Sequence, residues 1–203
     1  MSKSFAVFGL GRFGRKVATS LYESGYDVMG VDNNPDIIEE TSDKLTYAIE
    51  ADISKAEVIK GLGLEHMDVV IVSMGENLAA SIMSVMVSKE IGIPYVIAKA
   101  ADEMMGSILK KVGADRIIYP EEESGQRTAK LLMSDSFLEF FEIDNELCIL
   151  EIKAKKQWIG KTLKELDLRK NYKINIIAVK EEGKMHLVID PDRKIEEDDD
   201  FLV

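Results

Sequence analysis

The chain has 203 residues, of which 46% are apolar, and its formal net charge at pH 7 is −11. This length and apolar content suffice for one domain of ordinary size and a smaller second domain. The negative charge disfavours nucleic acid as a partner, since no basic run offsets it. No apolar stretch is long enough to span a bilayer and no secretory signal precedes the first apolar run, so we expect a cytoplasmic protein.

A glycine-rich turn lies near the N-terminus, between a strand pattern and a helix pattern. Residues 5–8 form a short apolar run that is typical of a buried parallel strand. Gly9 permits a tight turn, Gly11 lets backbone amides approach a pyrophosphate, and Gly14 lets the following helix pack closely on the strand. A turn of this kind is a weak signal alone, but the strand and helix patterns around it favour a nucleotide-binding site.

A second predicted strand, residues 26–31, ends in Asp32, about 20 residues after the turn, where an acid accepts hydrogen bonds from a ribose diol. The same acid would repel a 2′-phosphate, so NADP is disfavoured. Strand and helix patterns then alternate to residue 134, with further strands predicted over 47–51, 68–73, 95–98 and 116–119. We therefore predict an α/β fold with a Rossmann-like, doubly wound parallel sheet.

The pattern changes near residue 134, which predicts a nucleotide-binding domain over 1–134 and a small α+β domain over 135–203. The second domain is predicted to contain paired strands over 137–143 and 147–153, helical turns over 161–166, and a hairpin of strands 174–180 and 185–189. Five consecutive acids, 196–200, are expected to form a solvated turn. The apolar ending, 201–203, is typical of a strand that has only begun, so a truncated C-terminal domain is expected. So small a domain buries little core, which favours dimerisation.

Polar residues follow the predicted parallel strands at the ends where this fold binds ligands, namely Asp32, Asp52, Ser73, Asn77, Lys99 and Glu121. Several have simpler explanations. Arg12 could hold a phosphate or be an exposed arginine at a helix start. Asp52 could cap the next helix, Lys99 could simply be solvated, and an acid such as Glu121 suits a helix N-terminus whether or not it binds a metal ion.

Evidence for catalysis is weak. A dehydrogenase needs a substrate cavity and a proton donor or acceptor near the nicotinamide. His66 precedes the fourth predicted strand and His186 belongs to the second domain, so neither is expected where the parallel strands bind ligands. The sequence contains no Ser/His/Asp arrangement, metal-spaced Cys/His cluster or P-loop. It therefore predicts a non-enzymatic nucleotide-binding protein, with an NAD-dependent oxidoreductase or redox-sensing NAD(H)-binding protein as the alternative.

Four segments together, 5–14, 31–32, 69–73 and 113–121, resemble the RCK (TrkA-type) regulators of potassium transport, in particular the cytosolic gating subunits of bacterial Ktr uptake systems. The resemblance extends over the whole chain. It implies a regulatory subunit, assembled as an octameric ring of dimers, that docks on a membrane potassium-transporting (KtrB-like) subunit. Such a protein is cytoplasmic and peripheral to the inner face of the cell membrane.

The resemblance also implies two effector sites. ATP and ADP compete for the N-terminal crevice, where NAD(H) is also known to bind, and cyclic di-AMP binds a pair of C-terminal domains and inhibits uptake. By resemblance, Arg12 reads the terminal phosphate, partly across a subunit boundary, Asp32 holds the ribose hydroxyls, and Glu121 supports a divalent cation, Mg or Ca, near the γ-phosphate. The other implied nucleotide-site residues are Gly9, Gly11, Phe13, Gly14, Asn33, Asp52, Ile53, Ser73 and Lys99. The implied cyclic di-AMP residues are Arg169, Asn175, Ile176 and Pro191. Arg169 would take a phosphate; alternatively it is a surface charge near the end of a short helix.

Overall fold

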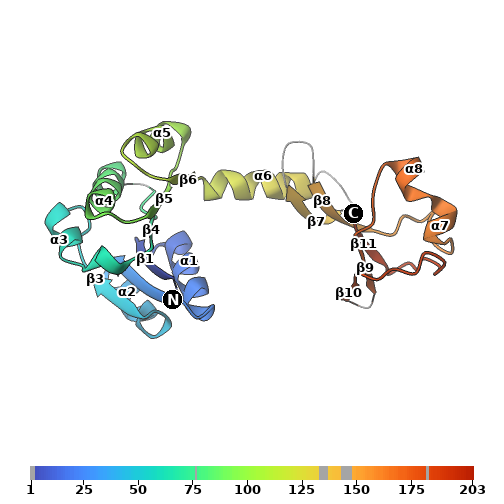
Figure 1. The fold of residues 1–203 in the computed structure, drawn as a ribbon, viewed down its shortest axis with the longest axis horizontal. Coiled ribbons are helices and arrows are strands. Elements are labelled where there is room, and N and C mark those ends of the chain that lie inside the picture. Colours follow the sequence, from blue (N-terminus) through green and yellow to red (C-terminus); the bar gives the residue numbers. More distant parts are fainter. Residues whose placement is uncertain (1–2, 76, 133–136, 143–147, 182) are drawn as a thin grey trace. The chain divides into compact units, whose positions relative to one another are not determined.

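A computed structural model describes residues 3–75, 77–132, 137–142, 148–181 and 183–203 of the chain (Figure 1). The chain divides into two compact units, unit 1 (Met1–Glu122) and unit 2 (Glu123–Val203). The domain boundary predicted at 134/135 lies outside the described residues.

Unit 1 is built on a six-stranded parallel sheet with the strand order β3-β2-β1-β4-β5-β6. Its strands are β1 (Ser4–Phe8), β2 (Asp27–Asp32), β3 (Tyr47–Glu50), β4 (Val69–Val72), β5 (Tyr95–Lys99) and β6 (Arg116–Ile118). This order is that of the doubly wound Rossmann fold, so the predicted fold class is confirmed. The order reverses between β1 and β4, and in such sheets ligands bind at the carboxyl ends of the strands beside that point.

Helices cover both faces of this sheet (Figure 1). They are α1 (Arg12–Glu23), α2 (Pro35–Thr41), α3 (Ala56–Lys60), α4 (Leu78–Ile91) and α5 (Glu103–Lys111), with short 3₁₀ helices η1 (Ser42–Lys44) and η2 (Leu64–His66). The next helix, α6 (Pro120–Leu132), begins in unit 1 and continues into unit 2. Alternate residues of a strand point to opposite faces. Phe8 therefore packs in the cluster under α3, α4 and α5, while Val7 packs in the cluster under α1 and α2.

Unit 2 contains an antiparallel sheet in the order β10-β9-β11-β8-β7. Its strands are β7 (Phe137–Glu142), β8 (Cys148–Lys153), β9 (Ala178–Glu181), β10 (Lys184–His186) and β11 (Asp200–Leu202), and its helices are α7 (Leu163–Leu166) and α8 (Leu168–Tyr172). The predicted hairpin is present but shorter, because β9 begins at Ala178 and β10 ends at His186. The turn between β7 and β8 lies outside the described residues.

The prediction that residues 196–200 form a solvated acidic turn is wrong at Asp199 and Asp200. Asp199 is only 3% exposed and accepts hydrogen bonds from both terminal nitrogens of Arg193, at 2.7 and 2.9 Å, and from the Glu196 N–H at 2.8 Å. Asp200 begins β11, which pairs on both sides, and Phe201 after it is buried. The run is therefore partly a structural element, because a buried carboxylate with a guanidinium partner is compensated.

Candidate functional site

The glycine turn between β1 and α1 is held by the ends of neighbouring strands. Gly9 has a φ of +85°, and its N–H donates to the Val31 carbonyl at 2.8 Å. The Ser73 hydroxyl donates to the Gly9 carbonyl at 2.5 Å. A Cβ on Gly14 would lie 2.0 Å from the Gly9 carbonyl oxygen and 2.3 Å from Ser73 Oγ. Glycine is therefore required at this position for α1 to pack against the turn, and Ser73 contacts the turn itself.

The N-terminus of α1 is uncapped and open. Gly11 is the N-cap residue, and among the described residues no side chain caps the N–H groups of the first turn. A Cβ on Gly11 would have no protein atom within 4 Å, so protein packing does not explain this glycine. Unpaired N–H groups and the helix dipole together form an anion-binding site. This end of α1 can therefore accept a phosphate group.

Asp32, at the end of β2, supports the same turn. Its Oδ2 accepts from the Leu10 N–H at 2.6 Å, and its Oδ1 accepts from the Asn34 N–H at 2.9 Å. The sequence predicted a ribose acceptor here and missed the bond to the turn. A carboxylate offers about four lone-pair sites, so Asp32 can still accept from a ribose diol.

A cavity of about 200 Å³ lies beside the turn. It is lined by Gly9, Asp32, Asn33, Asp52, Ile53, Ser54, Met74, Asn77 and Ala80. Five of these residues belong to the predicted nucleotide site, and Asn77 was noted as a polar residue of the crevice. The other predicted residues of the nucleotide site do not line this cavity, namely Gly11, Arg12, Phe13, Gly14, Ser73 and Lys99. The lining combines polar groups with the apolar side chains of Ile53, Met74 and Ala80, and this combination suits a flat base attached to a sugar.

Two buried serines of α4 support the cavity wall and were missed in the sequence. Ser84 is fully buried and donates to the Ile53 carbonyl at 3.4 Å, and Ser81 donates to the Met74 carbonyl at 3.1 Å. Ile53 and Met74 both line the cavity. The spacing of Ser81, Ser84 and Ser88 along an otherwise apolar helix was the sequence signal that could have identified them.

Asp52 lies at the cavity and closes a turn, but it does not cap the next helix as one of the two interpretations of the sequence expected. It lines the cavity, and its Oδ1 accepts from the Ser54 hydroxyl at 2.6 Å and the Ser54 N–H at 3.1 Å. Lys55 adds an ion pair at 3.2 Å. These Ser54 hydrogen bonds, followed by Lys55, lower the pKa of Asp52. The residue is therefore a carboxylate at neutral pH that closes a turn, whereas the N-cap residue of α3 is Lys55.

Lys99, at the end of β5, binds Glu121 in the first turn of α6. Its Nζ donates to Glu121 Oε1 at 2.6 Å and lies 5.9 Å from the ring centroid of Phe13. The Lys99 hydrogen bond is the main cause of a lowered pKa at Glu121, and the charge of Arg12 adds to it. In the described part of the chain, no group of three or more His, Cys, Asp or Glu residues could hold a metal ion. Glu121, which the resemblance predicts as a metal ligand, is paired with the Lys99 ammonium in this structure.

Neither histidine lines the cavity beside the glycine turn. His66 ends η2, directly before β4, and so lies toward the amino ends of the parallel strands. His186 ends β10 in unit 2. In this fold ligands bind at the carboxyl ends.

Family models give the relationship of the chain to known proteins. A TrkA-N domain model matches residues 5–120, and a TrkA-C domain model matches residues 147–203. The chain belongs to the RCK (TrkA-type) family. The resemblance predicted from the sequence motifs is therefore confirmed.

Two curated relatives of this family are similar over nearly their full length. The chain is 37% identical over 203 residues to the Ktr system potassium uptake protein C of Bacillus subtilis (strain 168), covering 100% of this chain and 91% of that protein. It is 32% identical over 202 residues to the Ktr system potassium uptake protein A of the same strain, again covering 100% and 91%. The GsuK channel bound to NAD has a TM-score of 0.67 at 16% identity, covering 100% of this chain and 37% of that chain, and this likeness shows the fold alone. Within the described residues, no helix combines the length and apolar character needed to cross a membrane.

The four residues predicted to bind cyclic di-AMP lie in or after α8 and in the loop at Pro191. Arg169 is exposed on α8, which is flanked by two non-glycine residues with positive φ, Asp167 (42°) and Lys173 (61°). The Pro191 carbonyl accepts from the Lys164 N–H at 3.2 Å, so this loop lies beside α7. Asn175 is exposed, and Ile176 packs on the core of unit 2. Among the described residues, no hydrogen bond or ion pair joins Arg169 to the other three.

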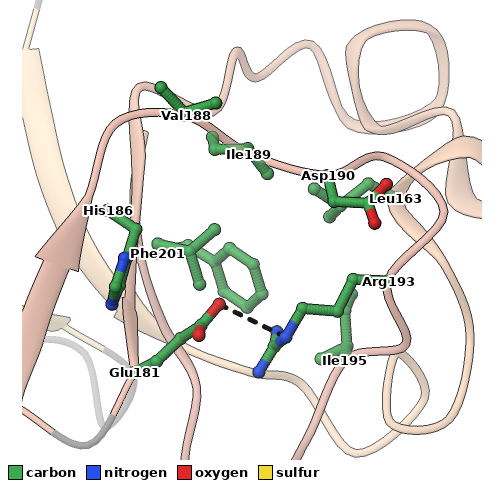
Figure 2. A pocket seen from close by; sticks show the side chains of 10 residues that line it. Leu163, Glu181, His186, Val188, Ile189, Asp190, Arg193, Ile195 and Phe201 are labelled. Atoms are coloured by element: carbon green, nitrogen blue, oxygen red, sulfur yellow. Dashed lines mark ion pairs between the residues drawn. The ribbon is translucent and has the colours of Figure 1, made fainter.

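A separate cavity of about 150 Å³ lies within unit 2 (Figure 2). Val179, Ile195 and Phe201 are its buried apolar residues, and its polar residues include His186, Asp190 and an ion pair of 3.2 Å between Arg193 Nε and Glu181 Oε1. None of the four residues predicted to bind cyclic di-AMP lines this cavity.

Proposed function

We infer that this chain is a cytosolic, non-enzymatic subunit that regulates a membrane potassium transporter in response to a nucleotide bound in unit 1. The observation that carries this inference is the uncapped N-terminus of α1, beside a cavity of base-and-sugar size that contains Asp32. The relatives in Ktr potassium uptake systems provide the link to potassium and indicate a KtrB-like membrane subunit as the partner.

The site has two parts, the cavity and the open N-terminus of α1, and together they suit ATP or ADP. The cavity of about 200 Å³ is smaller than the roughly 300–1,000 Å³ of a usual ligand pocket, so it would hold the adenosine while the phosphates lie outside it, on α1. NAD(H) is the other candidate, since the GsuK channel has been solved with NAD. Asp32 favours a free ribose diol in either case.

Regulation requires that the two nucleotides differ in their preference for the two conformational states of the subunit. Arg12 is exposed at the start of α1, and a guanidinium there can contact a terminal phosphate that ADP lacks. A shift from mostly one state to mostly the other requires about 5 kcal/mol of differential affinity. Hydrogen bonds to one charged phosphate contribute roughly 1.5–3 kcal/mol each. Several subunits in an octameric ring of dimers could together supply the difference.

Two finer proposals accompany this function. Glu121 would be a ligand of a divalent cation, Mg or Ca, that binds together with ATP. Cyclic di-AMP would bind a pair of C-terminal domains, with Arg169 on a phosphate and Asn175, Ile176 and Pro191 around the bases. Both proposals come from the resemblance to the family.

Calorimetric titration of the purified full chain with ATP, ADP and NADH tests the function. The wild type should bind ATP and ADP with different affinities, Arg12→Ala should bind both about equally, and the control Lys16→Ala, an exposed cation on the same helix, should behave as the wild type. An equal loss of ATP and ADP affinity in Arg12→Ala would contradict the role of Arg12. A wild type that binds no nucleotide would overturn the proposed function.

A further inference from the structure

The ion pair between Lys99 and Glu121 joins the nucleotide region to the helix that leaves unit 1. The Lys99 side chain is 15% exposed, whereas that of Glu121 is 70% exposed. An ammonium has three donors, and Glu121 Oε1 is its one hydrogen-bond acceptor among the described residues. Lys99 is therefore a largely desolvated cation that depends on a single, solvated carboxylate.

The surroundings of Lys99 bring its ammonium to the phosphate-binding end of α1. Its Nζ lies over the ring of Phe13, which belongs to the first turn of α1. Its stem lies against Gly75, since a Cβ there would be 3.0 Å from Lys99 Cε. Gly75 in turn follows Met74 of the cavity wall. An anionic group bound at the first turn of α1 would therefore compete with Glu121 for the same ammonium.

Glu121 is the second residue of α6, and the division between the two units falls one residue later, at 122/123. The ion pair thus ties the end of β5 to the first turn of the helix that continues into unit 2. A phosphate chain carries more negative charge than one carboxylate, and the attraction rises with that charge.

We propose that the Lys99–Glu121 pair is a latch that the phosphates of a bound nucleotide open, by drawing the Lys99 ammonium from Glu121 and freeing the first turn of α6. This inference rests on the proposed function, because it needs a nucleotide at α1. Lys99 thereby responds to the charge of the phosphates, and the change in α6 extends beyond unit 1. When the phosphates bind, Lys99 exchanges its ion pair with Glu121 for one with a phosphate, and the same exchange releases the first turn of α6.

Hydrogen exchange of the full chain, followed over the peptide that contains α6, tests the latch with ATP as the probe and EDTA present to remove divalent cations. ATP should increase exchange severalfold in the first turns of wild-type α6. Glu121→Gln should show the increased exchange without ATP and should bind ATP roughly threefold more tightly, since Lys99 no longer has to leave a carboxylate. Lys99→Met should also show the increased exchange without ATP. It should bind ATP more weakly than the wild type, because the ammonium that would contact the phosphates is missing. Glu103→Gln, an exposed acid in the first turn of α5, is the matched control and should behave as the wild type.

The outcomes separate the latch from the proposed function. If ATP binds to the wild type and exchange in α6 does not change, or if Glu121→Gln binds ATP as the wild type does, the latch is wrong and the nucleotide site stands. If the wild type does not bind ATP, ADP or NADH, the proposed function fails and the latch fails with it.

Discussion

Substitution of the two glycines on either side of the α1 start should separate folding from ligand binding. In Gly14→Ala the new methyl group would lie 2.0 Å from a backbone carbonyl oxygen and 2.3 Å from Ser73 Oγ, and neither the turn nor the hydroxyl can move away without breaking the Ser73–Gly9 hydrogen bond. In Gly11→Ala the methyl group would meet no protein atom within 4 Å, and the backbone, with φ −60° and ψ −175°, is one that alanine adopts readily.

The magnitude for Gly14→Ala follows from three contributions. Overpacking costs typically 1–3 kcal/mol, and loss of the Ser73 hydrogen bond costs about 1 kcal/mol. The better helix propensity of alanine offsets about 1 kcal/mol. We therefore expect unit 1 to lose about 2 kcal/mol, which corresponds to roughly 8 °C in Tm for a domain of this size. Gly11→Ala should change stability by less than about 1 kcal/mol. It should nevertheless weaken ATP binding, because in the proposed site its methyl group would occupy the path of the phosphates.

Thermal unfolding of the full chain can report the two units separately. The single tryptophan, Trp158, is fully buried in unit 2, so its fluorescence follows unit 2, whereas circular dichroism follows both units. Gly14→Ala should shift a transition seen by circular dichroism and leave the fluorescence transition in place. Unchanged circular dichroism in Gly14→Ala would refute the packing argument. A folded Gly11→Ala that binds ATP as well as the wild type would refute the location of the phosphates.

Three further predictions concern unit 2. Asp199→Asn should destabilise it by about 2 kcal/mol, because the substitution weakens the hydrogen bonds of a buried carboxylate to the partly exposed Arg193, and tryptophan fluorescence during urea unfolding measures the loss. Burial, the largest influence, would raise the pKa of Asp199, but hydrogen bonds from Arg193 and a backbone N–H hold it below its ordinary value. The stabilisation is therefore complete above the unfolded-state pKa of about 3.9 and is lost as the pH falls through the lower folded-state pKa; a variant as acid-sensitive as the wild type would contradict this. Lys173→Gly should stabilise unit 2 by about 1 kcal/mol, because Lys173 has a φ of +61°, which glycine adopts without strain. The control Lys170→Gly, within α8, should destabilise unit 2 by a similar amount. Equal effects of the two substitutions in the same assay would rule out backbone strain at Lys173. Arg169→Ala should weaken cyclic di-AMP binding in calorimetry and leave ATP affinity unchanged, and an unaltered cyclic dinucleotide affinity would remove Arg169 from that site.

Local sequence signals identified most of the elements and part of the site. The apolar run before Gly9, the glycine spacing and the acid after the second strand are short-range features, so the βαβ start was predictable from residues that lie close together in the chain. The doubly wound class of the sheet could be inferred from the alternation of strands and helices, because crossovers between parallel strands have one preferred hand. These rules do not reach into unit 2, where short strands with weak alternation left the predicted hairpin several residues too long.

Interactions between distant residues were not accessible in the same way. Asp32 appeared as a ribose acceptor, and its bond to the Leu10 N–H became visible only when β2 was paired with β1. Asp199 appeared as one acid among five, since nothing local marks the one that a guanidinium will cover. A charged residue has the same sequence signal whether it is solvated or buried with a partner, because the difference arises from what the fold places against it.

The sequence by itself determined the doubly wound sheet, the glycine turn and the family, because periodicity and turn chemistry act over a few residues and limit the topology. Only the tertiary structure decided that Ser73 and Asp32 hold the turn, that Ser81 and Ser84 support the cavity wall, and that Lys99 is paired with Glu121. Most of these contacts join residues that are distant in the chain and that the parallel sheet places side by side. Their partners follow from strand order and register, which no local pattern of residues contains.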